Sequence, residues 1–534
     1  MIKTRTLLSR WALTRLLAAL AGLAGPAAAQ APTAVRSIDI DLAKAGAPID
    51  RSFDLAVGAD YAGTLIRPDS LAQLDTAVTE LGFRYVRFHD IFTDALGTVQ
   101  RRDGKIVYDW TKIDKLYDAL LARKIRPFVE LGFTPAALKT SEQTIFYWKG
   151  NTSHPQADGW AALITAYVRH VRQRYGAAEV RRWYFEVWNE PNLAGFWEKA
   201  DKAAYFRLYE STARTIKAID PALRVGGPST AGAAWVPDLL DYAAARRVPI
   251  DFVTTHTYGV DGGFLDERGE DDNKLSTNPD AVSGDVRRVR AQIDASKFPG
   301  LPLFFTEWSS SYNPRDPVHD SYISGAYILT KLRATRPHAQ AMSYWTYSDL
   351  FEEAGPPPTP FHGGFGLMNR EGIRKPAWFA YKYLAQLRGR EIASADDQVL
   401  AATEAKRTAV LLWNWQQPLQ TVSNRPFFTK VLPAQAASDA AVRLTHLAAG
   451  SYRVTVRRTG FHANDAHTRY LEMGSPPALD AAQQAELRRL TADVPEITRT
   501  VRVAKDGQYQ LRVPMRTNDV VLVTLEPVGT HQAR

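Results

Sequence analysis

Short apolar runs alternate with longer amphipathic stretches between residues 50 and 390 of the chain. The short runs are rich in β-branched and aromatic residues, which favour strands, whereas the longer stretches repeat apolar residues at helical spacing. We expect eight strands here, over Phe53–Asp60, Tyr85–Asp90, Arg126–Phe133, Trp183–Glu190, Arg224–Pro228, Asp251–Tyr258, Leu303–Trp308 and Met342–Tyr347.

Helices are expected between these strands, for example over Ser70–Leu81, Asp109–Lys124 and Gly159–Tyr175. The second opens on an Asp in the capping position, and Gly176 stops the third. Eight strands alternating with helices predict a closed parallel barrel rather than an open doubly wound sheet. No Gly-rich phosphate fingerprint or P-loop follows a strand, which argues against a nucleotide-binding fold. The predicted fold class is therefore α/β, with a (β/α)8 TIM barrel over residues 49–390.

After residue 390 the pattern changes to alternation of apolar and polar residues with a period of two, which is typical of antiparallel sheets. We expect a β-sandwich domain over residues 391–534, with a single helix at Asp480–Ala492. Ser37–Leu42 alternates in the same way, so the N-terminal segment 30–48 is expected to pair with the sandwich. The strands expected in the sandwich are Val410–Trp415, Gly450–Arg457, Gln508–Val513 and Val520–Leu525.

Residues 1–29 have the pattern of a secretory signal peptide, with an apolar segment over Leu16–Gly25 and a small-residue cleavage site at 27–29. We therefore expect a periplasmic or extracellular protein that has no membrane partner once the signal is removed. The formal net charge of +9 suggests nucleic acid at first. However, part of that excess lies in the signal itself, so we expect no nucleic-acid partner; the signal's basic residues are Lys3, Arg5, Arg10 and Arg15.

Composition excludes several further classes of protein. The chain is 45% hydrophobic and 23% charged, which is globular composition rather than that of a disordered chain. It contains no cysteine, so disulfide scaffolds, thiolate metal sites, iron–sulfur clusters and cysteine nucleophiles are excluded.

Two carboxylates follow apolar strands of the predicted barrel, Glu190 after the fourth and Glu307 after the seventh. Because the carboxyl ends of all eight strands face one funnel, polar residues there are typical of a catalytic site. The alternative is that these carboxylates belong to structural ion pairs at the barrel rim. That interpretation would be the better one if only a single Glu were present. His89 ends the second strand, with Arg87 on the same face, and His256 ends the sixth. Metal binding is the competing interpretation, but no metal-ligand spacing is present and we expect no metal.

A pair of carboxylates in one funnel suits cleavage of a glycosidic bond, which needs a neutral acid at the leaving oxygen and an ionised partner across the sugar ring. Proximity of like charges would raise the pKa of the acid. Trp188, Trp308 and Trp345 can stack on sugar faces, or simply fill the rim. Long loops after the sixth, seventh and eighth strands, at Gly259–Asn278, Ser309–Asp320 and Leu350–Gly366, are expected to shape the binding site.

At this point the motifs resemble glycoside hydrolase family 39, one of a clan of barrels with the two carboxylates on strands four and seven. The resemblance covers most of the chain after residue 29 and implies no cofactor. Its most specific stretches are Tyr85-Val86-Arg87-Phe88-His89, Phe128-Val129-Glu130-Leu131-Gly132-Phe133, Phe185-Glu186-Val187-Trp188-Asn189-Glu190-Pro191-Asn192-Leu193, Thr255-His256-Thr257-Tyr258, Phe305-Thr306-Glu307-Trp308 and Tyr344-Trp345-Thr346-Tyr347-Ser348-Asp349.

The resemblance implies retaining hydrolysis, with Glu190 as general acid/base and Glu307 as nucleophile. It further implies that Asn189 binds the sugar 2-hydroxyl, that His89 binds a neighbouring hydroxyl, and that Tyr258 orients the nucleophile. His256 is implied to lie close to the acid/base, and Trp345 is expected to stack on the sugar. Glu352 and Glu353 match a position where xylosidases of the family bind the sugar.

The activities known in the family are chiefly β-xylosidase and α-L-iduronidase, and charge discriminates between them. An iduronate carboxylate needs cationic partners. The loop after the sixth strand carries six acidic side chains against only Arg268 and Lys274, and the loop after the eighth carries Glu352 and Glu353. We therefore expect an exo-acting β-D-xylosidase that releases xylose from the non-reducing end of xylo-oligosaccharides. Other family activities (α-L-iduronidase, β-glucosidase or β-galactosidase, α-L-arabinosidase, endo-acting exopolysaccharide hydrolase) and a non-catalytic carbohydrate-binding protein stay open as alternatives.

Overall fold

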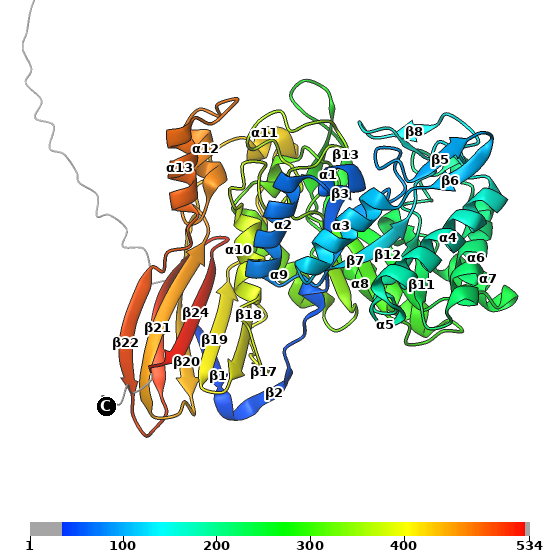
Figure 1. Cartoon of the computed structure of the whole chain (residues 1–534). Coiled ribbons are helices and arrows are strands. Elements are labelled where there is room, and N and C mark those ends of the chain that lie inside the picture. Colours follow the sequence, from blue (N-terminus) through cyan, green and yellow to red (C-terminus); the bar gives the residue numbers. More distant parts are fainter. Residues whose placement is uncertain (1–34, 529–534) are drawn as a thin grey trace, which may run out of the picture.

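The computed structural model describes residues 35–528, and the expected signal segment 1–29 lies outside them. A helix-rich barrel and a body of long strands lie side by side (Figure 1). Within residues 35–528, none of the helices combines the length and the apolarity needed to cross a membrane.

Eight parallel strands close into a barrel, which confirms the predicted fold class. Each pairs in parallel with the preceding barrel strand. The eighth pairs with the first, where Tyr344 lies opposite Val57. The barrel strands are β3 (Ala56–Tyr61), β4 (Tyr85–His89), β7 (Arg126–Leu131), β10 (Tyr184–Val187), β11 (Arg224–Thr230), β12 (Phe252–Tyr258), β15 (Leu303–Ser309) and β16 (Ala341–Tyr344).

One long helix follows each barrel strand and covers its outer face. Helix α2 begins with Pro68 and ends at Gly82, whose φ of 80° is accessible to glycine at little cost. Helix α4 ends at Gly176, as predicted. The eight helices are α2 (Pro68–Leu81), α3 (Thr111–Ala122), α4 (Ala157–Tyr175), α6 (Lys202–Ile219), α7 (Val236–Arg246), α8 (Ser283–Asp294), α9 (Ile323–Thr335) and α10 (Pro376–Leu384).

Some strand ends differ from the prediction. Residues 52–54 form a turn of 3₁₀ helix, so the first barrel strand begins only at Ala56. The fourth strand ends at Val187, and Glu190 lies beyond it with a φ of 44°. That residue stays attached to the barrel through its backbone N–H, which donates to the Ser229 carbonyl at 2.8 Å. The strand predicted from the apolar run is therefore too long, because its last residues, up to Glu190, lie beyond the end of the actual strand.

Inside the barrel, alternate residues of each strand point inward and form layers. The lowest layer is aromatic, because Tyr85, Phe128, Phe252 and Phe304 belong to one buried cluster that Tyr184 packs against. Two residues further along three of these strands come Arg87, Glu130 and Thr306, and on β10 comes Glu186, all buried. The alternation of side chains along these strands therefore places a layer of buried aromatic residues beneath a layer of buried polar ones.

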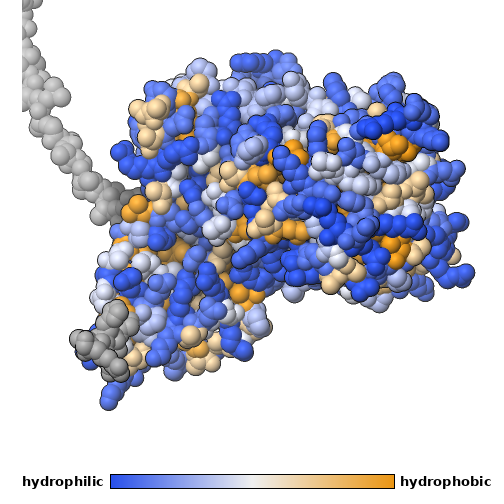
Figure 2. All heavy atoms as spheres, viewed as in Figure 1, coloured by the Kyte–Doolittle hydropathy of each residue, from blue (hydrophilic) through white to orange (hydrophobic). Residues whose placement is uncertain are grey.

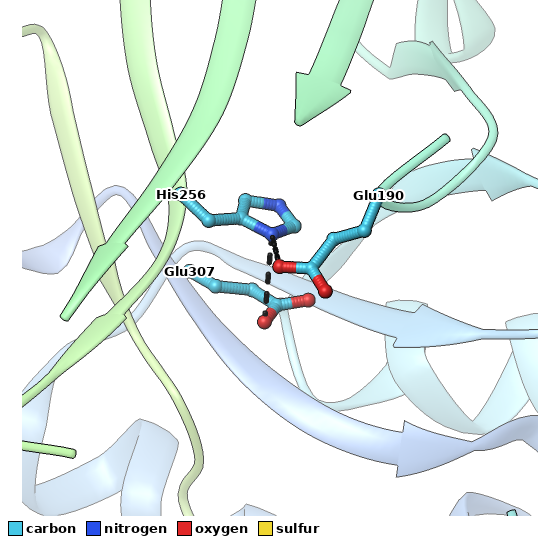
Figure 3. Close-up of side chains that lie close together, drawn as sticks. All are labelled: Glu190, His256 and Glu307. Carbon is cyan, nitrogen blue, oxygen red and sulfur yellow. Dashed lines mark hydrogen bonds and ion pairs between the residues drawn. The ribbon is translucent and has the colours of Figure 1, made fainter. Parts of the chain in front are cut away.

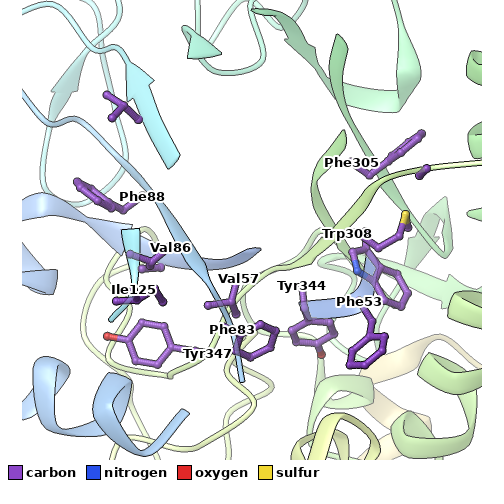
Figure 4. Close-up of a cluster of buried hydrophobic side chains, with 14 of the residues drawn as sticks. Phe53, Val57, Phe83, Val86, Phe88, Ile125, Phe305, Trp308, Tyr344 and Tyr347 are labelled. Atoms are coloured by element: carbon purple, nitrogen blue, oxygen red, sulfur yellow. The ribbon is translucent and has the colours of Figure 1, made fainter. Parts of the chain in front are cut away.

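The apolar residues between strands and helices form the main core. Figure 4 shows part of it, where Val57 and Val86 of adjacent strands lie near Phe83 and Tyr347. These side chains are at most 2% exposed. Burial of this kind on every strand is the main favourable contribution to folding.

The second body is a sandwich of two sheets. One sheet has the order β1-β20-β23 and the other β2-β17-β18-β19-β24-β21-β22. The N-terminal strands lie among the C-terminal ones (Figure 1), although β1 pairs with β20 in parallel, unlike the other pairs of the sandwich. The strands are β1 (Arg36–Asp41), β2 (Ala45–Pro48), β17 (Arg390–Ile392), β18 (Val399–Glu404), β19 (Arg407–Trp413), β20 (Ala436–Thr445), β21 (Gly450–Thr459), β22 (Ile497–Val503), β23 (Tyr509–Arg516) and β24 (Val520–Pro527).

Smaller elements decorate both bodies. The barrel loops carry three hairpins, and the sandwich carries three short helices, of which α13 begins with a capping box formed by Asp480 and Gln483. On the face in Figure 2, hydrophilic residues predominate and hydrophobic ones form separate patches. These elements are β5 (Val99–Arg102), β6 (Lys105–Tyr108), β8 (Thr144–Ile145), β9 (Gly150–Asn151), β13 (Val260–Leu265), β14 (Asp271–Leu275), α1 (Ala62–Leu65), α5 (Ala177–Val180), α11 (Asn424–Phe428), α12 (Ala466–Glu472) and α13 (Ala481–Leu490).

Candidate active site

A cavity of about 630 Å³ opens at the carboxyl ends of the barrel strands. This is the end where the predicted carboxylates lie, as expected for a barrel enzyme. Most of the predicted site residues line it, namely His89, Asn189, Glu190, Tyr258, Glu307, Trp345 and Glu353. Residues that the sequence did not single out also line it, among them Phe196, Asp285 and Tyr312.

Glu190 and Glu307 face each other beside His256 (Figure 3). His256 Nδ1 lies 2.9 Å from Glu190 Oε1 and 3.6 Å from Glu307 Oε2. One oxygen of each carboxylate and one nitrogen of the ring all lie within 4.8 Å of one another. Both carboxylates are buried, so their charges interact strongly.

Arg87 is the hub beneath this pair. Its fully buried guanidinium lies 2.5 Å from Glu186, 2.9 Å from Glu130 and 2.7 Å from Glu307 Oε1. It also donates to Asn189 Oδ1 at 2.8 Å. Arg87 thereby connects the buried polar layer of the barrel to Glu307 and to Asn189, the neighbour of Glu190. The sequence placed Arg87 on the face of His89 but gave it no role, because its partners come from three other strands.

Tyr258 binds the other oxygen of Glu307. Its hydroxyl donates to Glu307 Oε2 at 2.7 Å. Burial and the charge of Glu307 raise the pKa of Tyr258 well above its ordinary value, so the hydroxyl remains a donor. Both oxygens of Glu307 are therefore hydrogen-bonded, which fixes the plane of the carboxylate.

The two carboxylates differ in which protonation state their surroundings favour. Burial, and then the charge of Glu307, raise the pKa of Glu190 well above its ordinary value. Burial also raises the pKa of Glu307 to about 7, but Arg87 and Tyr258 act against that rise. Glu307 is consequently the first of the two to ionise, and Glu190 is the one that retains a proton.

His256 favours the same assignment. Burial, followed by repulsion from Arg87, lowers the pKa of His256 well below its ordinary value, so the ring is neutral. Its Nε2 lies 3.2 Å from the Thr306 hydroxyl, which itself donates to Glu186 Oε1 at 2.8 Å. The ring proton therefore sits on Nε2, and Nδ1 accepts a hydrogen bond from a protonated Glu190. His256 does not line the cavity, so it contacts Glu190 and does not face the cavity itself.

A second buried network surrounds His89. Its Nδ1 lies 2.7 Å from Glu130 Oε2 and its Nε2 lies 3.2 Å from Glu353 Oε1. Burial alone would lower the pKa of His89, but the Glu130 carboxylate raises it well above its ordinary value. The Trp345 ring packs 4.8 Å from the imidazole, centre to centre. A charged imidazole, an acid and an indole thus share one wall of the cavity.

Glu352 does not line the cavity, unlike its neighbour Glu353. Its carboxylate pairs with Arg67 at 2.9 Å, and its backbone N–H donates to Asp60 Oδ2 at 2.9 Å. Glu352 begins a turn in which its carbonyl accepts from the backbone N–H of Gly355 at 3.1 Å. The two acids expected to bind sugar therefore have separate positions, one paired with Arg67 and the other at the cavity. Of the three tryptophans, only Trp345 lines the cavity, because Trp188 and Trp308 are fully buried in the core.

A buried ion triad holds the loop after β16. Lys375 Nζ lies 2.6 Å from both Asp320 Oδ1 and Asp349 Oδ2, and all three side chains are fully buried. The lysine also donates to the Gly364 carbonyl at 2.9 Å, next to the cavity-lining Phe365. The triad therefore determines where this wall of the cavity lies.

Glu190, His256 and Glu307 are also the one group of side chains within residues 35–528 whose spacing could hold a metal ion. Arg87 and Tyr258 already donate to the two oxygens of Glu307. A guanidinium at 2.7 Å would repel a cation there, so the arrangement fits a catalytic carboxylate pair better than a metal site.

The sequence matches the family described as glycosyl hydrolases family 39 over residues 36–510. The chain belongs to this family. It is 36% identical to a β-xylosidase of Geobacillus stearothermophilus over 90% of this chain and 93% of that protein.

Two crystal structures extend the comparison. A family 39 enzyme of Xanthomonas axonopodis pv. citri is 66% identical, with a TM-score of 0.93 over 94% of this chain and all of that one. A monomeric β-xylosidase of Caulobacter crescentus is 64% identical, with a TM-score of 0.91 over 92% of this chain and all of that one. The resemblance to family 39 drawn from the motifs is confirmed.

Proposed function

We propose that this family 39 protein is a retaining β-D-xylosidase that releases xylose from the non-reducing end of xylo-oligosaccharides. The observation that carries the retaining mechanism is the spacing of Glu190 and Glu307, whose facing oxygens lie within 4.8 Å. Retaining glycosidases keep their carboxyl groups about 5–5.5 Å apart, whereas inverting ones leave room for a water molecule. The similar β-xylosidases support the choice of sugar.

In the first step, Glu307 attacks the anomeric carbon as a carboxylate. Glu190 gives its proton to the glycosidic oxygen as the bond between that oxygen and the anomeric carbon breaks, and the leaving alcohol departs neutral. A covalent xylosyl ester of Glu307 results, and Glu190 is left ionised. His256 Nδ1 then has a carboxylate in place of a hydroxyl beside it.

In the second step, Glu190 accepts a proton from water as the water oxygen attacks the anomeric carbon. The ester bond to Glu307 breaks, xylose leaves with its original anomeric configuration, and both carboxylates return to their starting states. Arg87 and Tyr258 stabilise the carboxylate of Glu307 as it is released, since both donate to its oxygens.

The remaining polar residues suit recognition of sugar hydroxyls. Asn189 accepts from Arg87 through Oδ1, which leaves its amide N–H₂ to donate to the 2-hydroxyl. Glu353 and His89 offer an acceptor and a donor on the neighbouring wall. Within the described residues, none that lines the cavity is lysine or arginine, which favours a neutral sugar over a uronic acid.

The charge argument from the loop after β12 needs revision. Asp266 pairs with Arg425 at 2.7 Å, and Asp272 accepts from the backbone N–H of the same residue. These acids anchor the loop instead of facing the sugar. Asp285, on α8, is the acid that lines the cavity beside the two catalytic ones and Glu353.

A panel of aryl glycosides tests the proposal. We expect a higher kcat/KM for aryl β-D-xyloside than for β-glucoside, β-galactoside, α-L-arabinoside or α-L-iduronide, and proton NMR should show β-xylose as the first product. A reversed ranking would overturn the choice of sugar, and α-xylose as the first product would overturn the retaining mechanism. Absence of turnover on every member of the panel would favour a carbohydrate-binding protein.

We further propose export of the protein, on the pattern of residues 1–29 alone. The expected outcome is a mature protein that lacks this segment, in the periplasm or the medium. Mass measurement of the intact protein from fractionated cells tests it, and an uncleaved chain in the cytoplasm would refute it.

A further inference from the structure

The cavity has a buried end and an exposed end. His89, Trp345 and Glu353 line the buried end, where the first two are 1% and 2% exposed. Leu193 and Tyr312 also line the cavity, yet they are 39% and 53% exposed. A terminal sugar enclosed at the buried end places its leaving group at the exposed end.

The acid/base identifies the same side. Glu190 protonates the leaving oxygen, so cavity-lining residues that are close to Glu190 and more exposed than the enclosed end can contact the leaving group. Leu193 and Phe196 are in that segment and line the cavity. Leu193 is tied to the acid/base itself, since its backbone N–H donates to the Glu190 carbonyl at 3.0 Å.

Tyr312 is held in place although it is exposed. Its hydroxyl donates to Asn273 Oδ1 on β14 at 2.8 Å. Its ring lies edge-on to Tyr258, with centres 6.3 Å apart and an angle of 81° between the planes. Tyr258 in turn donates to Glu307, so Tyr312 stands next to the nucleophile on the outer side. A fixed and exposed aromatic ring at this position suits an apolar sugar face.

The sandwich domain braces the segments that carry Tyr312 and Asn273. Asn424, at the start of α11, accepts from the backbone N–H of Leu275 at 3.0 Å and donates to Asp316 Oδ2 at 2.7 Å. The first contact fixes the hairpin β13–β14, and the second fixes the loop after β15. One side chain from outside the barrel therefore sets the spacing between these two loops.

We propose that Tyr312, with Leu193 and Phe196, forms the subsite for the leaving group, and that its ring is the platform for the first sugar of a neutral oligosaccharide. This inference rests on the proposed function. Its consequence is selective, because Tyr312 contributes to substrates whose leaving group reaches the exposed end and not to the enclosed sugar.

Two substrates separate these contributions. Xylobiose has a sugar as leaving group, whereas β-D-xylopyranosyl fluoride has a single atom and cannot reach the platform. We expect Tyr312→Ala to lower kcat/KM for xylobiose about tenfold, the size of one lost aromatic contact. The loss on the fluoride should be smaller, less than about threefold, because only the edge contact with Tyr258 is removed there. Tyr312→Phe keeps the ring and should stay within about threefold of the wild type on both substrates.

Matched variants test whether the effect belongs to the cavity. Leu265→Ala removes an exposed apolar side chain (60% exposed) from the hairpin β13–β14, outside the cavity. It should change kcat/KM for neither substrate. Leu193→Ala should reproduce the selective loss on xylobiose more weakly, and it replaces Tyr312→Ala if that variant does not fold.

The outcomes are distinct. An equal loss on both substrates, or no loss on xylobiose, in Tyr312→Ala and Leu193→Ala overturns the platform. A wild-type protein that hydrolyses neither xylobiose nor the fluoride overturns the proposed function instead. We also expect Tyr312→Ala to transfer less xylose from the fluoride to added xylobiose, relative to hydrolysis, and an unchanged ratio contradicts the subsite.

Discussion

Replacement of Tyr258 by Phe removes one hydrogen bond from Glu307, the proposed nucleophile, and leaves the ring in place. The lost contact is the 2.7 Å bond to Glu307 Oε2. A hydrogen bond to a charged group contributes about 1.5–3 kcal/mol net. One pKa unit corresponds to about 1.36 kcal/mol, so the loss should raise the pKa of Glu307 by about one to two units.

The sign follows from which form the hydroxyl stabilises. Tyr258 donates to the carboxylate, so its removal favours the protonated acid and moves the pKa of Glu307 further above about 7. Because Glu307 must be ionised to attack, the acid limb of the kcat/KM profile should move to higher pH. The maximal kcat/KM should fall about 10- to 100-fold.

The assay is the pH dependence of kcat/KM on an aryl β-xyloside. Tyr205→Phe is the control, since this buried hydroxyl donates to the carbonyls of Val187 and Pro228, behind the strands, and its loss should leave the acid limb in place. An acid limb that does not move in Tyr258→Phe, whatever the loss of rate, would refute the reasoning.

Three further outcomes follow from the contacts described. Glu307→Ala should abolish turnover, and azide or formate should restore part of it; activity like that of the wild type would remove Glu307 from the mechanism. Glu353→Gln should raise KM for the xyloside about tenfold because it weakens the contact with His89. Glu352→Gln loses only the outer pair with Arg67 and should raise KM less than about threefold. A larger rise in Glu352→Gln than in Glu353→Gln would contradict these positions. Lys375→Met should lower the free energy of unfolding by about 3–5 kcal/mol because two buried carboxylates lose their partner. Urea unfolding measures it against Lys115→Met, which replaces an exposed lysine of α3, and equal midpoints would refute it.

The barrel was predictable because each strand is a nearly continuous apolar run and is followed by an amphipathic stretch with recognisable ends. That Glu190 and Glu307 meet at one end of the barrel was predictable for a related reason, since ionisable residues directly after such runs are costly unless they have a function or a partner. The sandwich was harder to predict. Strand β20 is rich in alanine and contains Asp439, residue types that strands disfavour, so no strand is expected there from the pattern.

The finer parts of the site depend on contacts between distant segments. Arg87 acquires its role from β7, β10 and β15, whose registers bring three carboxylates to one guanidinium. Glu352 and Glu353 are indistinguishable in a sequence, and only the loop conformation sends one to Arg67 and the other to the cavity. Tyr312 follows a strand by three residues and carries no motif. No local pattern encodes such pairings.

The order of strands in the sandwich has a consequence for how the chain is made. Strand β24 lies between β19 and β21 in its sheet. Strand β1 pairs with β20, which is synthesised some 400 residues later. All eight barrel strands precede these partners, so a nascent chain can close its barrel while the sandwich still lacks its middle. Until β24 emerges from the ribosome, β19 and β21 present unpaired edges, which other chains can bind. Interrupted synthesis would therefore leave a formed barrel attached to an aggregation-prone half-sheet.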